Sequence, residues 1–153
     1  MGGTTLITGG SRGIGAATAL LAAKAGHAVV LSYRQDAEAA AEVVRQITGA
    51  GGKALAVQAD VSLEADVERL FAACDEAFGP LTGLVNNAGI LSRQSRVEDM
   101  DAARLRHMFE VNVVSQFLCA RAAVRRMSTR HGGQGGAIVN LSSAASRLGS
   151  PNE

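Results

Sequence analysis

Cysteine and tryptophan are scarce in this chain, and their scarcity narrows what the protein can do. The 153 residues contain no tryptophan, one tyrosine and two cysteines. Cys74 and Cys119 lack the CxxC spacing and the neighbouring histidines of a zinc site, so we expect buried free thiols and neither a disulfide nor a metal site. The three histidines form no ligand pattern either, and we therefore expect no metal cofactor.

Charge of one sign and long apolar runs are also lacking. Fifteen basic and fourteen acidic residues leave a net charge of +1, and the arginines are scattered without interleaved aromatics, so nucleic acid is not indicated as a partner. No apolar run approaches the roughly 20 residues of a membrane span, and no charged-then-apolar leader precedes the first strand. We expect a cytoplasmic protein without a membrane partner.

The chain is long enough for one domain over residues 1–153, and its 47% of hydrophobic residues can form a core. The pattern predicts strands alternating with helices: strands at residues 4–8, 28–33, 54–58, 84–86 and 137–141, and helices at 16–25, 36–48, 62–78 and 100–130. The strands are continuously apolar, as in parallel sheets covered on both faces. We predict an α/β fold with a doubly wound, Rossmann-like parallel sheet, and ligands beyond the carboxyl ends of its strands.

A glycine-rich turn separates the first strand from the first helix, with the sequence Thr8-Gly9-Gly10-Ser11-Arg12-Gly13-Ile14-Gly15. Glycines lack Cβ and let an anion approach the unpaired N–H groups and the positive dipole end of the helix. The spacing is not that of a P-loop, because Ala16 stands where the phosphate-binding lysine would follow. The turn predicts a dinucleotide pyrophosphate site, and a tight turn without a ligand is the alternative.

The end of the second strand bears on the choice of dinucleotide. An NAD site usually carries an acidic residue there for the ribose 2′-hydroxyl, whereas this chain has Tyr33 and Arg34. The guanidinium of Arg34, with that of Arg12, suits the 2′-phosphate of NADP through charge-assisted hydrogen bonds. The alternative is that Arg34 is a solvated loop residue and Asp36 only a helix N-cap.

Four spaced motifs together resemble the short-chain dehydrogenase/reductase family: the glycine turn, Asp60-Val61, Asn86-Asn87-Ala88-Gly89, and Asn112 with Ile138-Val139-Asn140-Leu141-Ser142-Ser143. The resemblance implies an oxidoreductase that transfers a hydride between NADP(H) and a carbonyl or secondary alcohol. It implies Asn112 and Ser143 as catalytic residues. It also implies a set of cofactor-binding residues: Gly9, Ser11, Arg12, Gly13, Ile14, Gly15, Tyr33, Arg34, Asp60, Val61, Asn87, Ala88 and Gly89.

Each motif also has a purely structural interpretation. Asp60 is suited to cap the helix that follows, and the asparagines and glycine of residues 86–89 are suited to a polar turn. Asn112 lies in an apolar helical setting, where the family has a helix distortion that holds a water of the proton relay; an ordinary helix-interior asparagine is the alternative. Of the two serines, Ser143 matches the catalytic serine of the family better than Ser142.

The acid and base of the family are missing from these residues. The family uses a tyrosine with a lysine four residues later, yet the chain has only Tyr33, Lys24 and Lys53, all far from the fifth strand. In the family this pair falls a little more than a dozen residues after the serine, which is past Glu153. We therefore expect a longer natural chain, a loop at residues 150–153, and little turnover by these residues alone. The alternative function is a catalytically silent NADP-binding module.

The substrate and the assembly are less well defined by the sequence. Residues 92–98 either line the mouth of the substrate pocket or form a solvated loop. The resemblance implies a homotetramer, in which the long helix packs across a dimer axis. That helix carries an apolar stripe, and the stripe suits either this interface or the core against the sheet: Met108, Phe109, Val113, Phe117 and Ala120.

Overall fold

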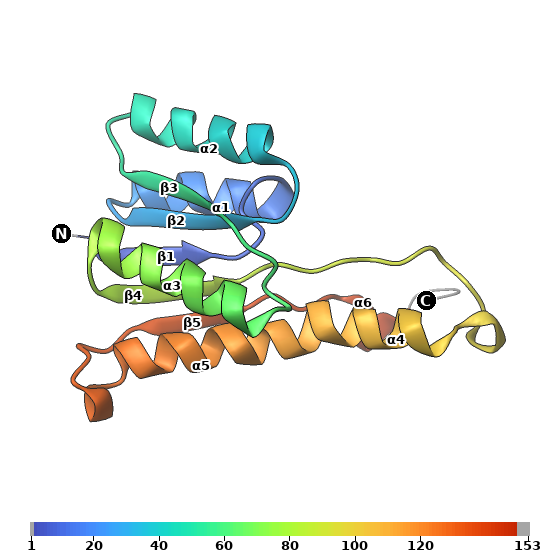
Figure 1. Cartoon of the computed structure of the whole chain (residues 1–153). Helices are drawn as coiled ribbons and strands as arrows, with labels where there is room; N and C mark the ends of the chain where they lie inside the picture. Colours follow the sequence, from blue (N-terminus) through green and yellow to red (C-terminus); the bar gives the residue numbers. More distant parts are fainter. Residues whose placement is uncertain (1, 150–153) are drawn as a thin grey trace.

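Five parallel strands form the centre of the computed structural model, which describes residues 2–149 (Figure 1). The strands are β1 (Thr4–Ile7), β2 (Ala28–Tyr33), β3 (Ala54–Gln58), β4 (Leu81–Asn86) and β5 (Ala137–Asn140). Their order in the sheet is β3-β2-β1-β4-β5, so the direction of winding reverses between β1 and β4. The predicted Rossmann-like α/β fold is confirmed.

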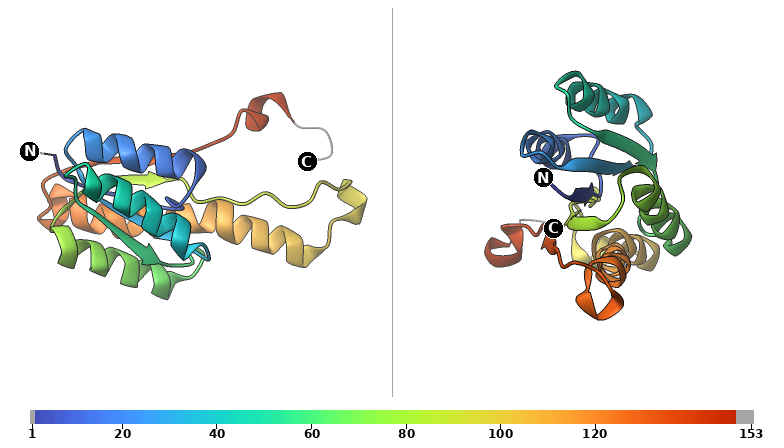
Figure 2. Two further views of the ribbon diagram at one scale, coloured as in Figure 1. Left: turned by 90° about the horizontal axis from the view of Figure 1, so that it is seen from above. Right: turned by 90° about the vertical axis from the view of Figure 1, so that its left-hand side faces the viewer.

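Helices cover both faces of this sheet (Figure 2). The helices are α1 (Gly13–Lys24), α2 (Ala37–Gly49), α3 (Glu64–Phe78), α4 (Ala102–Phe109), α5 (Ser115–Met127) and α6 (Ala145–Leu148). Helices α1 and α2 pack on one face, and α3 and α5 pack on the other. Within residues 2–149, none of the helices combines the length and the apolar character that crossing a membrane requires.

The continuously apolar strands supply two cores, because successive side chains of a strand point to opposite faces. Leu6 and Val30 belong to the core with α3 and α5, whereas Ile7, Val29 and Leu31 belong to the core with α1 and α2. All five are fully buried. The continuous apolar runs that predicted a sheet covered on both faces therefore supply core side chains on both faces.

The boundaries differ from the prediction at several elements. Strand β4 begins at Leu81 and not at the predicted residue 84. Pro80 and Gly83 give this part of the sequence the composition of a turn, but Leu81 is buried in the core and extends the strand. Helix α1 begins at Gly13, three residues earlier than expected. A short helix that the sequence did not predict, α6, follows β5. The predicted loop at residues 150–153 lies outside the described residues.

The expected long helix is interrupted by a π-helical segment, Glu110–Val114, between α4 and α5, and it ends at Met127. Its apolar stripe does not face the sheet: Phe109 is 60% exposed and Phe117 is 74% exposed. The sheet-facing side consists instead of buried residues such as Cys119 and Ala123. The interpretation of the stripe as core is therefore wrong.

The two cysteines are free and buried, as predicted, and they are expected to be chemically inert in the folded state. Burial raises the pKa of each thiol to about 12, with the charge of Asp75 adding to the effect at Cys74. Thiolate is the reactive form, so at pH 8 iodoacetamide should modify neither residue before unfolding and both after it. Mass spectrometry measures this, with Ser92→Cys, at an exposed position, as the reactive control. Rapid alkylation of native Cys119 would contradict the burial.

Candidate functional site

The glycine turn between β1 and α1 lies at the carboxyl edge of the sheet, where the strand order reverses. Gly9 and Gly13 have φ values of +64° and +55°, in the left-handed region that favours glycine. Gly15 is required for a different reason: a Cβ there would lie 2.3 Å from the Gly9 carbonyl oxygen and 2.5 Å from Asn87 Nδ2. A Cβ on Gly13 would meet nothing within 4 Å, so the turn is open on that side.

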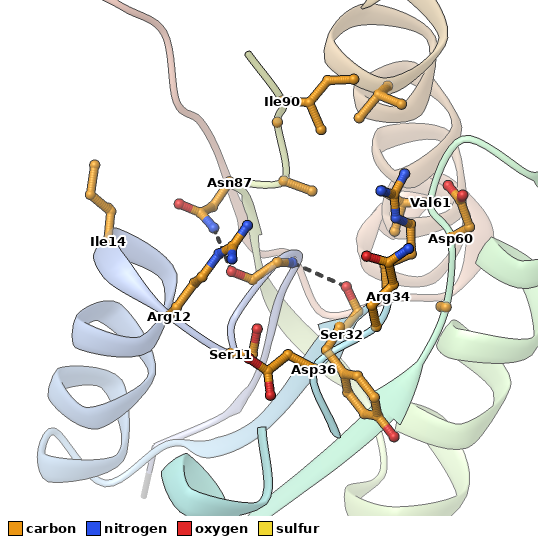
Figure 3. Close-up of a pocket in the computed structure, with 17 residues that line it drawn as sticks. Ser11, Arg12, Ile14, Ser32, Arg34, Asp36, Asp60, Val61, Asn87 and Ile90 are labelled. Carbon is orange, nitrogen blue, oxygen red and sulfur yellow. Dashed lines mark hydrogen bonds between the residues drawn. The ribbon is translucent and has the colours of Figure 1, made fainter. Parts of the chain in front are cut away.

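Strand β2 holds one side of this turn through Ser32. The Gly9 amide donates to Ser32 Oγ at 3.1 Å (Figure 3). The Gly10 amide donates to the Ser32 carbonyl at 2.8 Å. Ser32 is 1% exposed. Sequence reasoning did not find this residue, because a serine inside an apolar strand carries no motif of its own.

The segment that follows β4 holds the other side of the turn through Asn87. Its Nδ2 donates to the carbonyl oxygens of Thr8 at 2.8 Å and Gly9 at 2.9 Å. In return, Thr8 Oγ1 accepts from the backbone amides of Asn87 at 3.0 Å and Ala88 at 2.9 Å. Both amide protons of the Asn87 side chain are therefore used to hold the turn, and within residues 2–149 its side-chain oxygen accepts no hydrogen bond.

A hollow of about 480 Å³ opens between these segments. Its lining includes every cofactor residue expected from the sequence except Gly13 and Gly15, which belong to the glycine turn but do not line the hollow. The residues come from the glycine turn, the end of β2, the Asp60-Val61 pair and the segment after β4 (Figure 3). Ser32, Gln35, Asp36, Ala59, Ile90 and Val111 also line the hollow, and the sequence had not indicated them as ligand contacts.

The lining of the hollow contains two basic and two acidic side chains, and they differ in their partners. Neither Arg12 nor Arg34 has an ion-pair partner within residues 2–149, and both are exposed. The two carboxylates of the lining are engaged locally: Asp36 Oδ1 accepts from the Ala39 amide at 2.9 Å as the N-cap of α2. Asp60 Oδ1 accepts from the amide and the hydroxyl of Ser62 at 3.0 Å and 2.6 Å. The predicted N-cap role of Asp36 is therefore confirmed. The predicted cap role of Asp60 is wrong, because α3 begins only at Glu64 and its N-cap residue is Leu63, which receives no side-chain cap bond.

Asn112 lies in the π-helical segment, so the helix distortion that the resemblance implied at this residue is present. Its side chain forms two hydrogen bonds with the backbone of Ile90: Oδ1 accepts from the amide at 2.7 Å, and Nδ2 donates to the carbonyl at 2.9 Å. Gln116 Nε2 donates to the Asn112 carbonyl at 3.0 Å. Asn112 therefore fixes the wall of the hollow at Ile90 without lining the hollow itself.

Ser143 follows β5 and is exposed. Its Oγ accepts from the Ala145 amide at 3.2 Å, at the start of α6. Because this bond uses an oxygen lone pair, the hydroxyl proton is free to be donated elsewhere. Ser143 does not line the hollow, and within residues 2–149 no hydrogen bond joins it to Asn112.

Comparison with known proteins agrees with this arrangement. The model of the short chain dehydrogenase family matches residues 3–153. The uncharacterized oxidoreductase YgfF of Escherichia coli is 55% identical over 148 residues, which cover 97% of this chain and 60% of that protein. A 3-oxoacyl-[acyl-carrier-protein] reductase of Synechocystis is 38% identical over 152 residues, covering 97% of this chain and 58% of the relative. The chain therefore belongs to the short chain dehydrogenase family.

Solved structures show the same fold. A short chain dehydrogenase of Burkholderia cenocepacia in complex with NADP superposes with a TM-score of 0.88 at 37% identity, over 97% of this chain and 58% of that one. A short-chain dehydrogenase/reductase of Serratia marcescens gives 0.89 at 35% identity, over 99% of this chain and 59% of the other. The chain thus spans about three fifths of the length of the relatives it matches.

The packing at Gly15 predicts that Gly15→Ala disrupts the turn. The added methyl group would meet the Gly9 carbonyl and the Asn87 amide, which do not move without breaking the hydrogen bonds described above. We expect a loss of about 1–3 kcal/mol in the free energy of unfolding, measured by urea denaturation. Gly49→Ala is the matched control, because a Cβ there meets nothing within 4 Å, and it should be neutral or stabilising. Equal effects of the two substitutions would contradict the packing argument.

Proposed function

We propose that this protein is an NADP(H)-dependent oxidoreductase that transfers a hydride between the cofactor and a carbonyl or secondary alcohol, and that the hollow is its cofactor site. The observation that carries the proposal is the combination of an open glycine turn at a helix N-terminus with two arginines that lack acidic partners within residues 2–149. Membership of the short chain dehydrogenase family supports it. So does the NADP complex of the Burkholderia neighbour.

The residues present fit a dinucleotide phosphate. The glycine turn offers the N–H groups at the start of α1 to a pyrophosphate. Arg12 and Arg34 would hold the 2′-phosphate, because guanidinium groups form charge-assisted hydrogen bonds with phosphate oxygens. The Asp60-Val61 pair would contact the adenine, and the segment Asn87 to Gly89 the nicotinamide ribose. Asp36 is less suited to a ribose hydroxyl, because its carboxylate already caps α2.

When bound, the nicotinamide would supply or accept the hydride. The residues of the chain would position the substrate. Ser143 would donate its hydroxyl proton as a hydrogen bond to the substrate oxygen, since its own oxygen is already bonded to the Ala145 amide. Asn112 would keep Ile90 in place at the edge of the site. Residues 1–153 contain no Tyr-x-x-x-Lys pair for the proton transfer, so we infer that they bind the cofactor but turn over little substrate by themselves.

We also propose a homotetramer that acts on small molecules in the cytoplasm. An exposed apolar stripe runs over α4, the π-helical segment and α5, and it includes Phe109, Val113 and Phe117. This stripe supports an interface between copies of the chain. Contiguous apolar surface of this kind is characteristic of protein contacts, and closed symmetry is the rule for soluble homo-oligomers.

The role of Arg34 predicts the cofactor preference. Arg34→Leu should raise the Kd for NADP about 10- to 100-fold, the range expected for losing a charge-assisted hydrogen bond, and leave the Kd for NAD nearly unchanged. Titration calorimetry with each dinucleotide at fixed low salt measures both constants. Arg45→Leu is the control, since Arg45 is paired with Glu38 and Glu42 on α2, away from the hollow. A wild-type protein that binds NAD more tightly than NADP would refute the assignment.

The role of Ser143 predicts a loss of turnover. In the polypeptide as its gene encodes it, Ser143→Ala should lower kcat at least about 100-fold while the Kd for NADP stays unchanged, because the hydroxyl would stabilise charge on the substrate oxygen. Reduction of a ketone panel with NADPH is the measurement. Ser142→Ala is the neighbouring control and should retain most activity. Equal losses in the two variants would show that the serine was assigned wrongly.

A further inference from the structure

A second hollow lies on the loop between β4 and α4, and only polar side chains line it. Its volume is about 540 Å³. The lining consists of Arg93, Gln94, Ser95, Arg96, Asp99 and Arg104. Three arginines and one aspartate thus contribute to the lining of a space large enough for a small anion and its water shell.

Two of these arginines are available to a ligand. Arg96 is paired with Glu98 at 2.5 Å. Arg93 has no ion-pair partner within residues 2–149. The Nη1 of Arg104 donates to Ser95 Oγ at 2.7 Å, and this bond orients the side chain. Because the serine is uncharged and a guanidinium has five donor hydrogens, Arg104 keeps its charge and further donors for a ligand. Asp99 opposes an anion, yet Arg93 and Arg104 together outweigh its single charge.

The fold holds this loop in a defined place. Asp101 Oδ1 accepts from the Arg104 amide at 2.8 Å and so caps α4, which fixes the helix end that carries Arg104. At the other end of the loop, the backbone of Ile90 is bonded twice to Asn112. The loop therefore runs out from Ile90, and α4 and the π-helical segment return to Asn112. The hydrogen bonds between Ile90 and Asn112 hold the two ends of this hairpin together beside the candidate cofactor site.

The hollow lined by Arg93 and Arg104 (the loop hollow) belongs to the loop that leaves the cofactor hollow at Ile90, and it lies on another part of the sheet edge than Arg34. Ile90 lines the cofactor hollow, and Arg93 follows it by three residues, which places their Cα atoms at most about 11 Å apart. The loop and the segment from β5 to α6, which carries Ser143, project beyond the same edge of the sheet (Figures 1 and 2). Arg34 belongs to the end of β2, two strands away from β4 in the sheet.

We propose that the loop hollow binds an anionic group of the substrate, a carboxylate or a phosphate ester, through Arg93 and Arg104. This inference rests on the proposed function, since the other end of the same substrate would react at the cofactor. The substrate class is then a ketone or secondary alcohol with an anionic group several bonds from the reacting carbon. Planar guanidinium groups match both oxyanions, and Ser95 adds a hydroxyl to the site.

The first experiment tests binding without any turnover. Backbone amide NMR of the protein follows titration with inorganic phosphate and, separately, with succinate. We expect shifts at residues 93–104 that are lost in the double variant Arg93→Gln/Arg104→Gln and retained in Arg106→Gln, which removes a charge from the same helix outside the hollow. Tighter binding of phosphate assigns a phosphate ester, and tighter binding of succinate assigns a carboxylate. No shift with either anion overturns the proposal.

The second experiment tests specificity in the polypeptide as its gene encodes it, with 7-oxooctanoate and its methyl ester as matched probes. Arg93→Gln should raise KM for the acid about tenfold and leave KM for the uncharged ester unchanged, as expected when one charge-assisted contact is lost. Arg106→Gln should change neither. Equal KM values for acid and ester in the parent protein, or an equal rise for both in Arg93→Gln, would overturn the proposal.

The failure of this inference is distinguishable from the failure of the proposed function. If the protein binds NADP and reduces the ester, yet anions cause no shifts at residues 93–104, the proposed function stands and the proposed anion site is refuted. Anion shifts at these residues in a protein that binds no dinucleotide would leave an anion site but refute its assignment to a substrate.

Discussion

The candidate site depends on one side chain, the amide of Asn87, which joins the ends of β1 and β4. It donates to two carbonyl oxygens of the glycine turn, and Thr8 accepts two backbone amides of the β4 end in return. Each such bond contributes about 0.5–1.5 kcal/mol net, and leaving one buried partner unsatisfied costs more. The bonded residues lie 78 to 80 residues apart in the chain, so these hydrogen bonds form only when β1 and β4 have paired in the sheet.

The hydrogen bonds of Asn87 also explain why the last residue of the turn, Gly15, is a glycine. A side chain at Gly15 would occupy the space of the Asn87 amide, so the glycine spacing serves the packing of the turn as well as the approach of a ligand. Ser32 holds the opposite side of the turn from β2. The turn is thus fixed from both neighbouring strands before any ligand arrives, which reduces the ordering that binding requires.

The sequence predicted the order of elements because apolar runs and turn residues are local signals, and it predicted the edge at which the motifs meet because parallel strands share a carboxyl edge. It could not predict partners that meet only in the folded chain, such as Ser32 with the glycine turn. Periodicity groups Phe109 and Phe117 on one helix face, but it does not indicate whether the sheet covers that face. The start of β4 was misplaced because burial of Leu81 depends on α3, α5 and the sheet together.

The π-helical segment connects the two hollows physically. A π turn shifts the backbone bonds of the helix, and here the Gln116 side chain bonds to the Asn112 carbonyl while the Asn112 side chain reaches the backbone of Ile90. The Gln116 carbonyl in turn accepts from Asn86 at 3.2 Å, and Asn86 donates to Asn140 on β5 at 2.9 Å. One polar network therefore links β5, β4 and α5 to the base of the loop. This network holds the backbone of Ile90, which lines the cofactor hollow and precedes Arg93 in the loop between β4 and α4. A substitution that moves Asn112 would therefore displace both the wall of the cofactor hollow and the start of this loop.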